Sequence, residues 1–142
     1  MIQLKVKKLT SNAKLPTKAY KGDLGFDLYS IETVTIKSNE KPVSIRTGIA
    51  IELPENYGAL ILDRSSLASQ GLHVVAGVID NGYRGEIIVK MVNLTKDPIT
   101  LLEGTKIAQM ILIPIVDCNI IEVNQLSETE RNDKGFGSSG IR

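Results

Sequence analysis

The segment from Gly77 to Glu86 places a carboxylate next to a tight turn and an aromatic residue. Asp80 directly precedes Asn81 and Gly82, and Tyr83 follows them; Asn-Gly is a pair typical of a two-residue hairpin turn. The spacing alone favours a structural role, in which Asp80 bonds turn amides and Tyr83 belongs to a strand. In a reactive site, the Asp80 carboxylate would polarise a water molecule as a general base, and Tyr83 would pack against a sugar.

The backbone of this hairpin is a second source of specific contacts. Backbone N–H and C=O groups can read the edge of a flat base through hydrogen bonds, and the candidates for this contact are Gly77, Val78 and Ile79. Together with Asp80, these residues would combine base recognition with activation of water.

Two further segments carry groups that suit phosphate binding. Arg64 precedes Ser65 and Ser66 at the start of a predicted short helix, so free helix N–H groups and a guanidinium fork would face the same anion. The structural alternative is a surface arginine beside an ordinary helix cap. Farther along, a glycine turn feeds a strand that carries Lys106 and Gln109, a pattern that by itself indicates only a strand with a solvated lysine.

Asp27 is a carboxylate in an apolar strand context. It either bonds turn amides or, at a triphosphate site, holds water on a magnesium ion, which prefers oxygen ligands and keeps several of its waters. The chain has one cysteine, Cys118, and one histidine, His73. An internal disulfide and a structural zinc site built from these residue types are therefore excluded.

The composition changes after Leu126. Residues 127–142 include only Phe136 and Ile141 as large apolar groups, so they cannot pack a core of their own. A polar tail of this kind is most often a frayed terminus. Here, however, a lone aromatic between glycines, with Arg131 upstream, suits a mobile arm that closes over a ligand. Phe136 would stack on a flat ring, and the serines and glycine amides that follow would donate to phosphate oxygens.

Alternation of apolar and polar residues predicts the elements that position these groups. It recurs over residues 2–6, 43–45, 49–53 and 107–115, and such alternation is typical of strands. Turn sequences separate these strands. The stretch Ser65 to Gln70 predicts one short helix, capped by its serines and ended by Gly71. Many short strands with close turns indicate an all-β barrel or sandwich.

Length and charge limit the classes of protein to consider. The chain has 142 residues, of which 42% are hydrophobic and 23% charged, and these values fit one folded domain with a real core. A net charge of +1 gives no overall field toward nucleic acid or anionic lipid, so neither a nucleic-acid nor a membrane partner is expected. The N-terminal stretch lacks the apolar run of a signal peptide, and no run approaches a membrane-spanning length, which predicts a cytoplasmic location.

Five segments, in this order, resemble the five motifs of the trimeric dUTPase family, from Gly25 to Gly140. They are GFDLYS, RSSLA, GVIDNGYRGEI, GTKIAQM and RNDKGFGSSG. One such string would be weak, whereas five in sequence within an all-β chain of this length are specific. The resemblance implies a jelly-roll-like β-barrel over residues 1–126 and a mobile C-terminal arm over residues 127–142. It also implies a homotrimer in which three subunits build each active site.

The resemblance further implies a reaction, the hydrolysis of dUTP to dUMP and pyrophosphate with Mg²⁺, which limits uracil incorporation into DNA and supplies dUMP for dTTP synthesis. Asp80 matches the general base that activates water for attack on the α-phosphorus, and Tyr83 matches the aromatic that crowds out a ribose 2′-hydroxyl. Asp27 matches the carboxylate near the metal waters. The other implied substrate contacts are Arg64, Ser65, Ser66 and Gln109 for phosphate, Gly77, Val78 and Ile79 for uracil, and Arg131, Phe136, Gly137, Ser138 and Ser139 in the arm, with Phe136 stacked on uracil.

Two alternative functions on the same fold are each opposed by individual residues of this chain. dCTP deaminase shares the fold and the string RSSLA, but it needs a glutamate ten residues after the matching aspartate, where this chain has Lys90. A non-catalytic nucleotide sensor predicts degraded catalytic positions, whereas Asp80 and Tyr83 are both present. The chain departs from the family pattern at Asp63, where proline is frequent, at Ser66, where glycine is common, and at Lys106, where arginine is frequent. None of these departures removes a required group.

Overall fold

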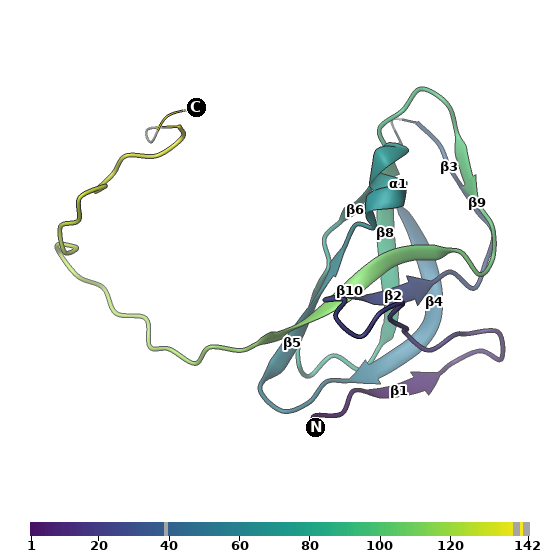
Figure 1. The fold of residues 1–142 in the computed structure, drawn as a ribbon, viewed down its shortest axis with the longest axis horizontal. Helices are drawn as coiled ribbons and strands as arrows, with labels where there is room; N and C mark the ends of the chain where they lie inside the picture. The colour runs from purple at the N-terminus through teal and green to yellow at the C-terminus, as the bar shows by residue number, and fades with distance from the viewer. Residues whose placement is uncertain (39, 138–139, 141–142) are drawn as a thin grey trace.

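The computed structural model describes residues 1–38, 40–137 and 140, and within them the chain forms strands joined by short turns, with one short helix (Figure 1). The elements are β1 (Lys5–Lys8), β2 (Phe26–Tyr29), β3 (Val34–Ile36), β4 (Val43–Glu52), β5 (Tyr57–Leu62), α1 (Ser65–Ser69), β6 (Leu72–Val75), β7 (Val78–Ile79), β8 (Glu86–Asn93), β9 (Ile99–Leu101) and β10 (Lys106–Pro114).

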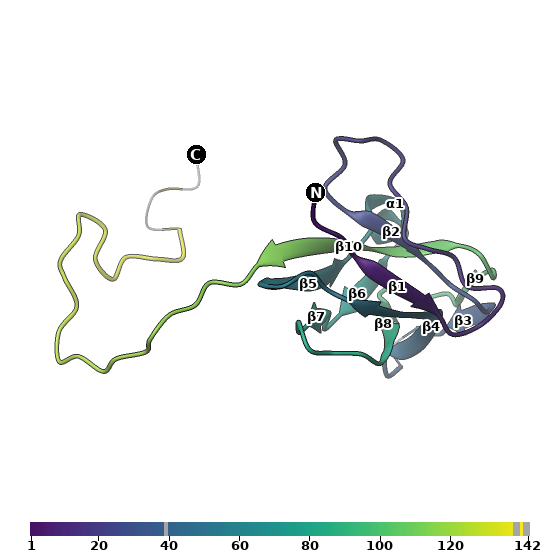
Figure 2. The same cartoon turned by 90° about the horizontal axis from the view of Figure 1, so that it is seen from below.

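Two four-stranded antiparallel sheets form the body of the protein. The strand order is β1-β4-β8-β6 in the first sheet and β2-β10-β5-β7 in the second, and β3 pairs with β9 in a separate ribbon. Figures 1 and 2 show β10 and β5 lying across β4 and β8, with the β3–β9 ribbon at one end. This architecture confirms the predicted all-β, jelly-roll-like barrel with one short helix.

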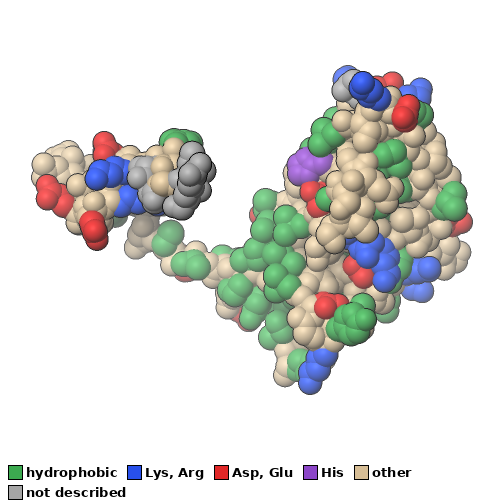
Figure 3. All heavy atoms as spheres, turned by 45° about the horizontal axis from the view of Figure 1, so that its top comes forward, with side chains coloured by type: hydrophobic (Ala, Val, Ile, Leu, Met, Phe, Trp, Pro, Cys, Tyr) green, Lys and Arg blue, Asp and Glu red, His purple; other side chains and the backbone are tan. Residues whose placement is uncertain are grey.

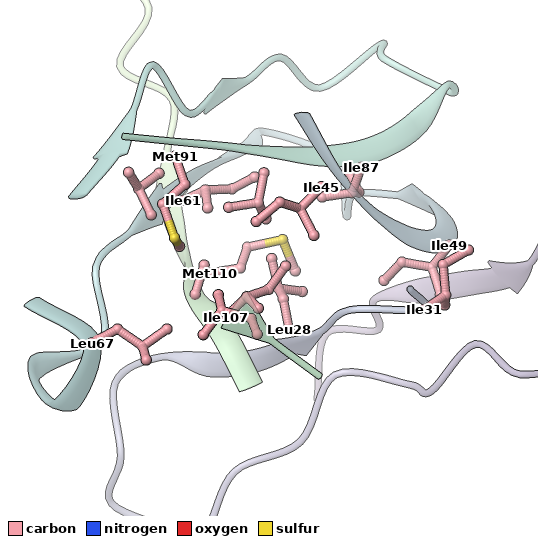
Figure 4. Close-up of a cluster of buried hydrophobic side chains, with 14 of the residues drawn as sticks. Leu28, Ile31, Ile45, Ile49, Ile61, Leu67, Ile87, Met91, Ile107 and Met110 are labelled. Atoms are coloured by element: carbon pink, nitrogen blue, oxygen red, sulfur yellow. The ribbon is translucent and has the colours of Figure 1, made fainter. Parts of the chain in front are cut away.

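The hydrophobic core lies between the two sheets (Figure 4). Ile45 and Ile87 come from the first sheet and Leu28 and Met110 from the second, and each is at most 1% exposed. Along β8, buried residues alternate with residues that face outward, because successive side chains of a strand point to opposite faces. Burial of each such side chain stabilises the fold by roughly 1.5–3 kcal/mol, and the outward positions are left for the site.

One strand is longer than its alternation predicts. The predicted strands at 43–45 and 49–53 form a single strand, β4, whose pairing with β8 shifts between Arg46 and Ala50. Gly48 lies inside this irregularity at φ +69°. An inserted residue changes which side chains face the core, so the sequence pattern appeared broken although the strand is continuous.

Two predicted element ends are wrong in detail. Alternation predicts a strand from Ile2, whereas β1 begins at Lys5 and the Ile2 side chain is 53% exposed. The predicted helix is confirmed as α1 and ends before Gly71 at φ +92°. Its N-cap is Arg64, with no side-chain capping bond, so the predicted serine cap is wrong because both serines lie inside the first turn. No helix of the described ranges is long and apolar enough to cross a membrane.

The hairpin predicted between Gly77 and Glu86 is wrong in its pairing, although its turn is confirmed. The Tyr83 N–H donates to the Asp80 carbonyl at 3.1 Å, which closes the turn. The two flanks belong to different sheets, since β7 pairs with β5 whereas β8 pairs with β4 and β6. The segment therefore crosses between the sheets, because turn chemistry does not determine which strand each flank meets.

The chain leaves the barrel after β10. Residues 115–137 contain no helix or strand and extend away from the sheets (Figures 1 and 2). Their large apolar side chains are exposed, namely Ile115, Val116, Ile120, Ile121, Val123, Leu126 and Phe136. Figure 3 shows hydrophobic side chains continuing from the barrel along this departing segment. The division into a barrel over residues 1–126 and an arm over 127–142 stays a prediction.

Candidate active site

A pocket of about 430 Å³ opens between the end of β6, β7 and the outer face of β8. We call it the turn pocket. Its wall includes residues 74–80, Tyr83, Glu86 and Lys90. The predicted base contacts Gly77, Val78 and Ile79 therefore line the same pocket as Asp80 and Tyr83.

Asp80 lies at the edge of the turn pocket with an exposed side chain. The bonds that fix the turn come from its neighbour: Nδ2 of Asn81 donates to the carbonyls of Pro54 and Tyr57, both at 2.9 Å. Nη1 of Arg84 in turn donates to the Asn81 carbonyl at 2.8 Å. The turn is thus held without a described contact to the Asp80 carboxylate, which leaves this group accessible to water.

Gly77 has a conformation and a position that require glycine. Its φ is +130°, and an added Cβ would lie 2.5 Å from the Ile61 carbonyl oxygen. The Gly77 carbonyl accepts from the Ile61 N–H at 2.8 Å. β5 therefore fixes the backbone just before β7, and the pocket wall at residues 77–79 is preformed rather than a loose loop.

A second pocket, of about 270 Å³, collects the predicted phosphate-binding groups. We call it the cation pocket. It is lined by Ala19, Tyr20, Asp23, Asp27, Arg64, Ser65, Lys106 and Gln109. Of the predicted phosphate contacts outside the arm, only Ser66 is not part of this lining; its Oγ accepts from Nη1 of Arg64 at 3.4 Å. Three segments that are distant in sequence therefore meet here.

Strand pairing explains this convergence. Gln109 on β10 lies opposite Asp27 on β2 and opposite Leu62 on β5. Because Arg64 follows β5 by two residues, its guanidinium reaches Asp27, and Nε donates to Oδ1 at 3.2 Å. Nζ of Lys106 lies 3.4 Å from Oδ2 of the same carboxylate. The pocket thus holds two cations beside the Asp27 carboxylate, whose side chain is only 16% exposed.

Sequence reasoning missed the role of Asp63. Its carbonyl accepts from Nε2 of Gln109 at 2.8 Å. Its carboxylate accepts from the Val74 N–H at 2.5 Å and lies 2.6 Å from Nδ1 of His73; the histidine is visible at the surface in Figure 3. Asp63 therefore ties the connection between β5 and α1 to β6, which positions Arg64. No local pattern marks a contact across ten residues, so only the departure from proline at Asp63 pointed to this position.

The turn pocket and the cation pocket are separate within one chain, and they have no lining residue in common. The described arm residues Arg131, Phe136 and Gly137 line neither pocket. Phe136 is fully exposed, and Nε of Arg131 donates to the Lys134 carbonyl at 2.6 Å. The predicted contacts Ser138 and Ser139 lie outside the described residues.

Sequence comparison assigns the family. The dUTPase family model matches residues 11–140. The deoxyuridine 5′-triphosphate nucleotidohydrolase of Clostridioides difficile is 48% identical over 144 aligned residues, which cover 99% of this chain and 100% of the relative. The chain belongs to the dUTPase family. This finding confirms the resemblance that the five motifs carried.

Solved dUTPase structures have the same fold. A mutant dUTPase of Staphylococcus bacteriophage 80alpha with dUpNHpp matches with a TM-score of 0.89 and 30% identity, covering 98% of this chain and 99% of that one. A mutant dUTPase from phage phi11 of S. aureus, described with a structural Mg(II) ion, matches with a TM-score of 0.81 and 27% identity over 89% of this chain and 99% of that one. The barrel described above is therefore the dUTPase fold.

Proposed function

We propose that this protein hydrolyses dUTP to dUMP and pyrophosphate, with Asp80 as general base. The observation that carries the proposal is the turn pocket, where an exposed carboxylate, the preformed backbone of residues 77–79 and the Tyr83 ring share one cavity. The curated relatives are named for this reaction, and a structural neighbour holds dUpNHpp, a dUTP analogue. An enzyme acting on this nucleotide is expected in the cytoplasm, where the nucleotide pool lies.

In the proposed mechanism, the backbone of residues 77–79 bonds the uracil edge and Tyr83 packs against the deoxyribose, where it leaves no room for a 2′-hydroxyl. The Asp80 carboxylate takes a proton from water as the water oxygen attacks the α-phosphorus. The bond from the α-phosphorus to the bridging oxygen breaks, and pyrophosphate leaves with that electron pair. No covalent enzyme intermediate is needed.

The cation pocket suits the phosphate chain. A triphosphate carries about four negative charges, and charge shifts toward the leaving group during attack, so fixed donors and cations lower the barrier. Arg64 and Gln109 would bind phosphate oxygens, with the hydroxyls of Ser65 and Ser66 beside them. In the arm, Arg131, Gly137, Ser138 and Ser139 would complete the γ-phosphate contacts, and Phe136 would stack on uracil.

The carboxylates of the cation pocket fit magnesium held through water. Mg²⁺ usually takes one or two carboxylates, substrate phosphates and several waters, and Asp27 and Asp23 both line this pocket. We therefore expect Asp27 to hold a metal-bound water, with its other contacts to Arg64 and Lys106 orienting the carboxylate. When bound, the ion would neutralise charge on the phosphate oxygens.

The separation of the two pockets within one chain supports a homotrimer with shared active sites. A single nucleotide needs the base-binding and the phosphate-binding groups together, yet the pockets share no lining residue. The apolar side chains of residues 115–126 are exposed in one chain, which is costly in water unless another copy covers them. These observations support assembly, with the turn pocket and the cation pocket contributed by different subunits and the arm by a third.

The nearest rival activity, deamination of dCTP, lacks its proton shuttle here. Lys90, which replaces the required glutamate, lines the turn pocket. An ammonium group has no acceptor for the proton transfers that a carboxylate performs. Because Lys90 lies in the wall of the proposed base pocket, the lysine at this position favours dUTP hydrolysis over dCTP deamination.

The test is release of pyrophosphate from dUTP, dCTP, dTTP and UTP, each with Mg²⁺ and with a chelator. We expect turnover of dUTP alone, dependent on Mg²⁺. Conversion of dCTP to a product without its amino group, or equal hydrolysis of all four nucleotides, would contradict the proposal.

A further inference from the structure

Gly85 lies against the hydroxyl end of the Tyr83 ring. A Cβ added at Gly85 would lie 2.5 Å from the tyrosine Oη, 2.7 Å from Cζ and 3.0 Å from Cε1. Such separations are far inside van der Waals contact, so a methyl group at Gly85 and the Tyr83 ring cannot both keep their places. Gly85 does not have a positive φ. Glycine is therefore required here by the space for the ring and not by backbone conformation.

The tip of the same ring is fixed by a hydrogen bond. Oη of Tyr83 donates to the Glu86 carbonyl at 2.8 Å. The Glu86 carboxylate accepts from the Gly48 N–H at 2.9 Å and from Nε of Arg46 at 3.1 Å, and both of these residues belong to β4. The ring is thus held between the surface of Gly85 and a residue that is itself tied to a neighbouring strand.

Gly85 acts on the turn pocket only through this ring. Tyr83 and Glu86 line the pocket, whereas Gly85 does not. A methyl group at Gly85 would therefore leave the pocket wall unchanged except where it displaces the tyrosine. Its effect on a ligand is an effect of ring position.

We infer that Gly85 is a positioning residue that sets the place of the Tyr83 ring and thereby the selectivity for deoxyribose over ribose. The inference rests on the proposed function, in which Tyr83 packs against the sugar. When one group of a substrate does not fit a pocket wall, the ratio of kcat/KM between the fitting and the misfitting substrate is roughly 10–200. This selectivity depends on the wall holding its position. A methyl group at Gly85 would displace the ring and disturb its bond to Glu86, so the ring would no longer form a fixed wall against a 2′-hydroxyl.

The first test compares Gly85→Ala with the unaltered enzyme, using kcat/KM for dUTP and for UTP from pyrophosphate release. We expect the dUTP-to-UTP ratio to fall at least about tenfold. Gly82→Ala is the matched control, because it lies in the same turn, has no atom within 4 Å of an added Cβ, and does not have a positive φ. Its ratio should stay within about twofold, as for an open surface site. An unchanged ratio in Gly85→Ala would overturn the inference.

The second test separates this inference from the role assigned to Tyr83. Tyr83→Ala should lower the ratio by itself, and if it does not, the proposed sugar contact fails. If Tyr83→Ala lowers the ratio and Gly85→Ala does not, only the inference on Gly85 fails. In the double variant, Gly85→Ala should add no further loss, because the ring through which it acts is gone; an additional loss would overturn the inference.

The double variant also decides the outcome if Gly85→Ala does not fold. Removing the ring removes the steric conflict, so the double variant should fold and show the selectivity of Tyr83→Ala. A double variant that fails to fold as well would mean that glycine is needed for another reason, and would overturn the inference.

Discussion

Oδ1 of Asp27 accepts a hydrogen bond from Nε of Arg64 at 3.2 Å, so a carboxylate on β2 orients the guanidinium that precedes α1. The pair is partly buried, with side chains 16% and 29% exposed. A second cation, Lys106, approaches the other oxygen at 3.4 Å. In the proposed reaction, Asp27 would have two roles, because it would align a phosphate-binding arginine and would hold water on the metal ion.

Asp27→Asn should raise the Mg²⁺ concentration needed for half-maximal activity. The amide keeps the shape of the side chain but loses the charge, and groups that orient metal-bound ligands are typically worth about 10–100-fold in metal affinity. Mg²⁺ titration at saturating dUTP measures the change. Asp23→Asn is the control, because Asp23 lines the same pocket but bonds the Tyr20 N–H at 2.9 Å. Equal increases in the two variants would remove the special role of Asp27.

Asp80→Asn should bind dUTP and lose turnover. The amide preserves the turn, which is held by Asn81 and the Asp80 backbone, but it cannot accept a proton from water. General-base catalysis is worth roughly 10²–10⁴-fold, so single-turnover rates should fall by that factor while calorimetry shows retained binding. Asp97→Asn, at an exposed turn that lines neither pocket, is the control. Retained activity in Asp80→Asn would assign the base to another group.

Asp63→Ala should destabilise the fold by about 1–3 kcal/mol, because the Val74 N–H would lose its acceptor in a residue that is only 7% exposed. Asp63→Asn keeps an acceptor and should cost less. His73→Ala should cost at most about 1 kcal/mol, since the histidine side chain is 53% exposed and surface pairs contribute little. Urea unfolding at one fixed protein concentration measures all three. If His73→Ala costs as much as Asp63→Ala, the contact to the His73 ring rather than the bond to the Val74 N–H holds the connection.

The motif segments supplied predicted site residues to both pockets, and the resemblance to trimeric dUTPases already implied that one chain does not bring all of them together. Residues 77–80 and Tyr83 are close in sequence, so a single turn brings them together, and the turn pocket was predictable from local chemistry. Asp27, Arg64 and Gln109 meet only because β10 pairs with both β2 and β5. Alternation predicts that a segment is a strand but carries no information about its partner.

Two errors have the same physical origin. The Asn81-Gly82 pair correctly predicted a turn, but tertiary packing sent β7 to one sheet and β8 to the other. The Asp63 carboxylate accepts from the Val74 N–H and lies beside His73, and α1 lies between Asp63 and these residues in the sequence. Such a contact has no periodic signature. In both cases the deciding interaction is formed between elements, so the residue types alone could not reveal it.

Two truncations should separate the arm from the assembly segment. The buried hydrophobic residues lie between Ala13 and Met110, so chains ending at Pro114 or at Leu126 both retain the core. The chain ending at Leu126 keeps the exposed apolar stretch 115–126 and should form the proposed trimer, with turnover reduced about 10²-fold because the nucleotide is less well positioned. The chain ending at Pro114 lacks the apolar stretch and should become a folded monomer without activity.

Light scattering and circular dichroism, measured beside dUTP turnover, distinguish the outcomes of the truncations. A fully active chain ending at Leu126 would remove the arm from catalysis, and an unfolded one would make the arm structural. A trimeric chain ending at Pro114 would assign assembly to the barrel surfaces instead of residues 115–126.

Phe136→Ala in the full chain is the finer probe of the arm. Loss of the stacking contact should weaken dUTP binding by roughly 1–3 kcal/mol. The oligomeric state should not change, because this fully exposed ring contributes nothing to the core.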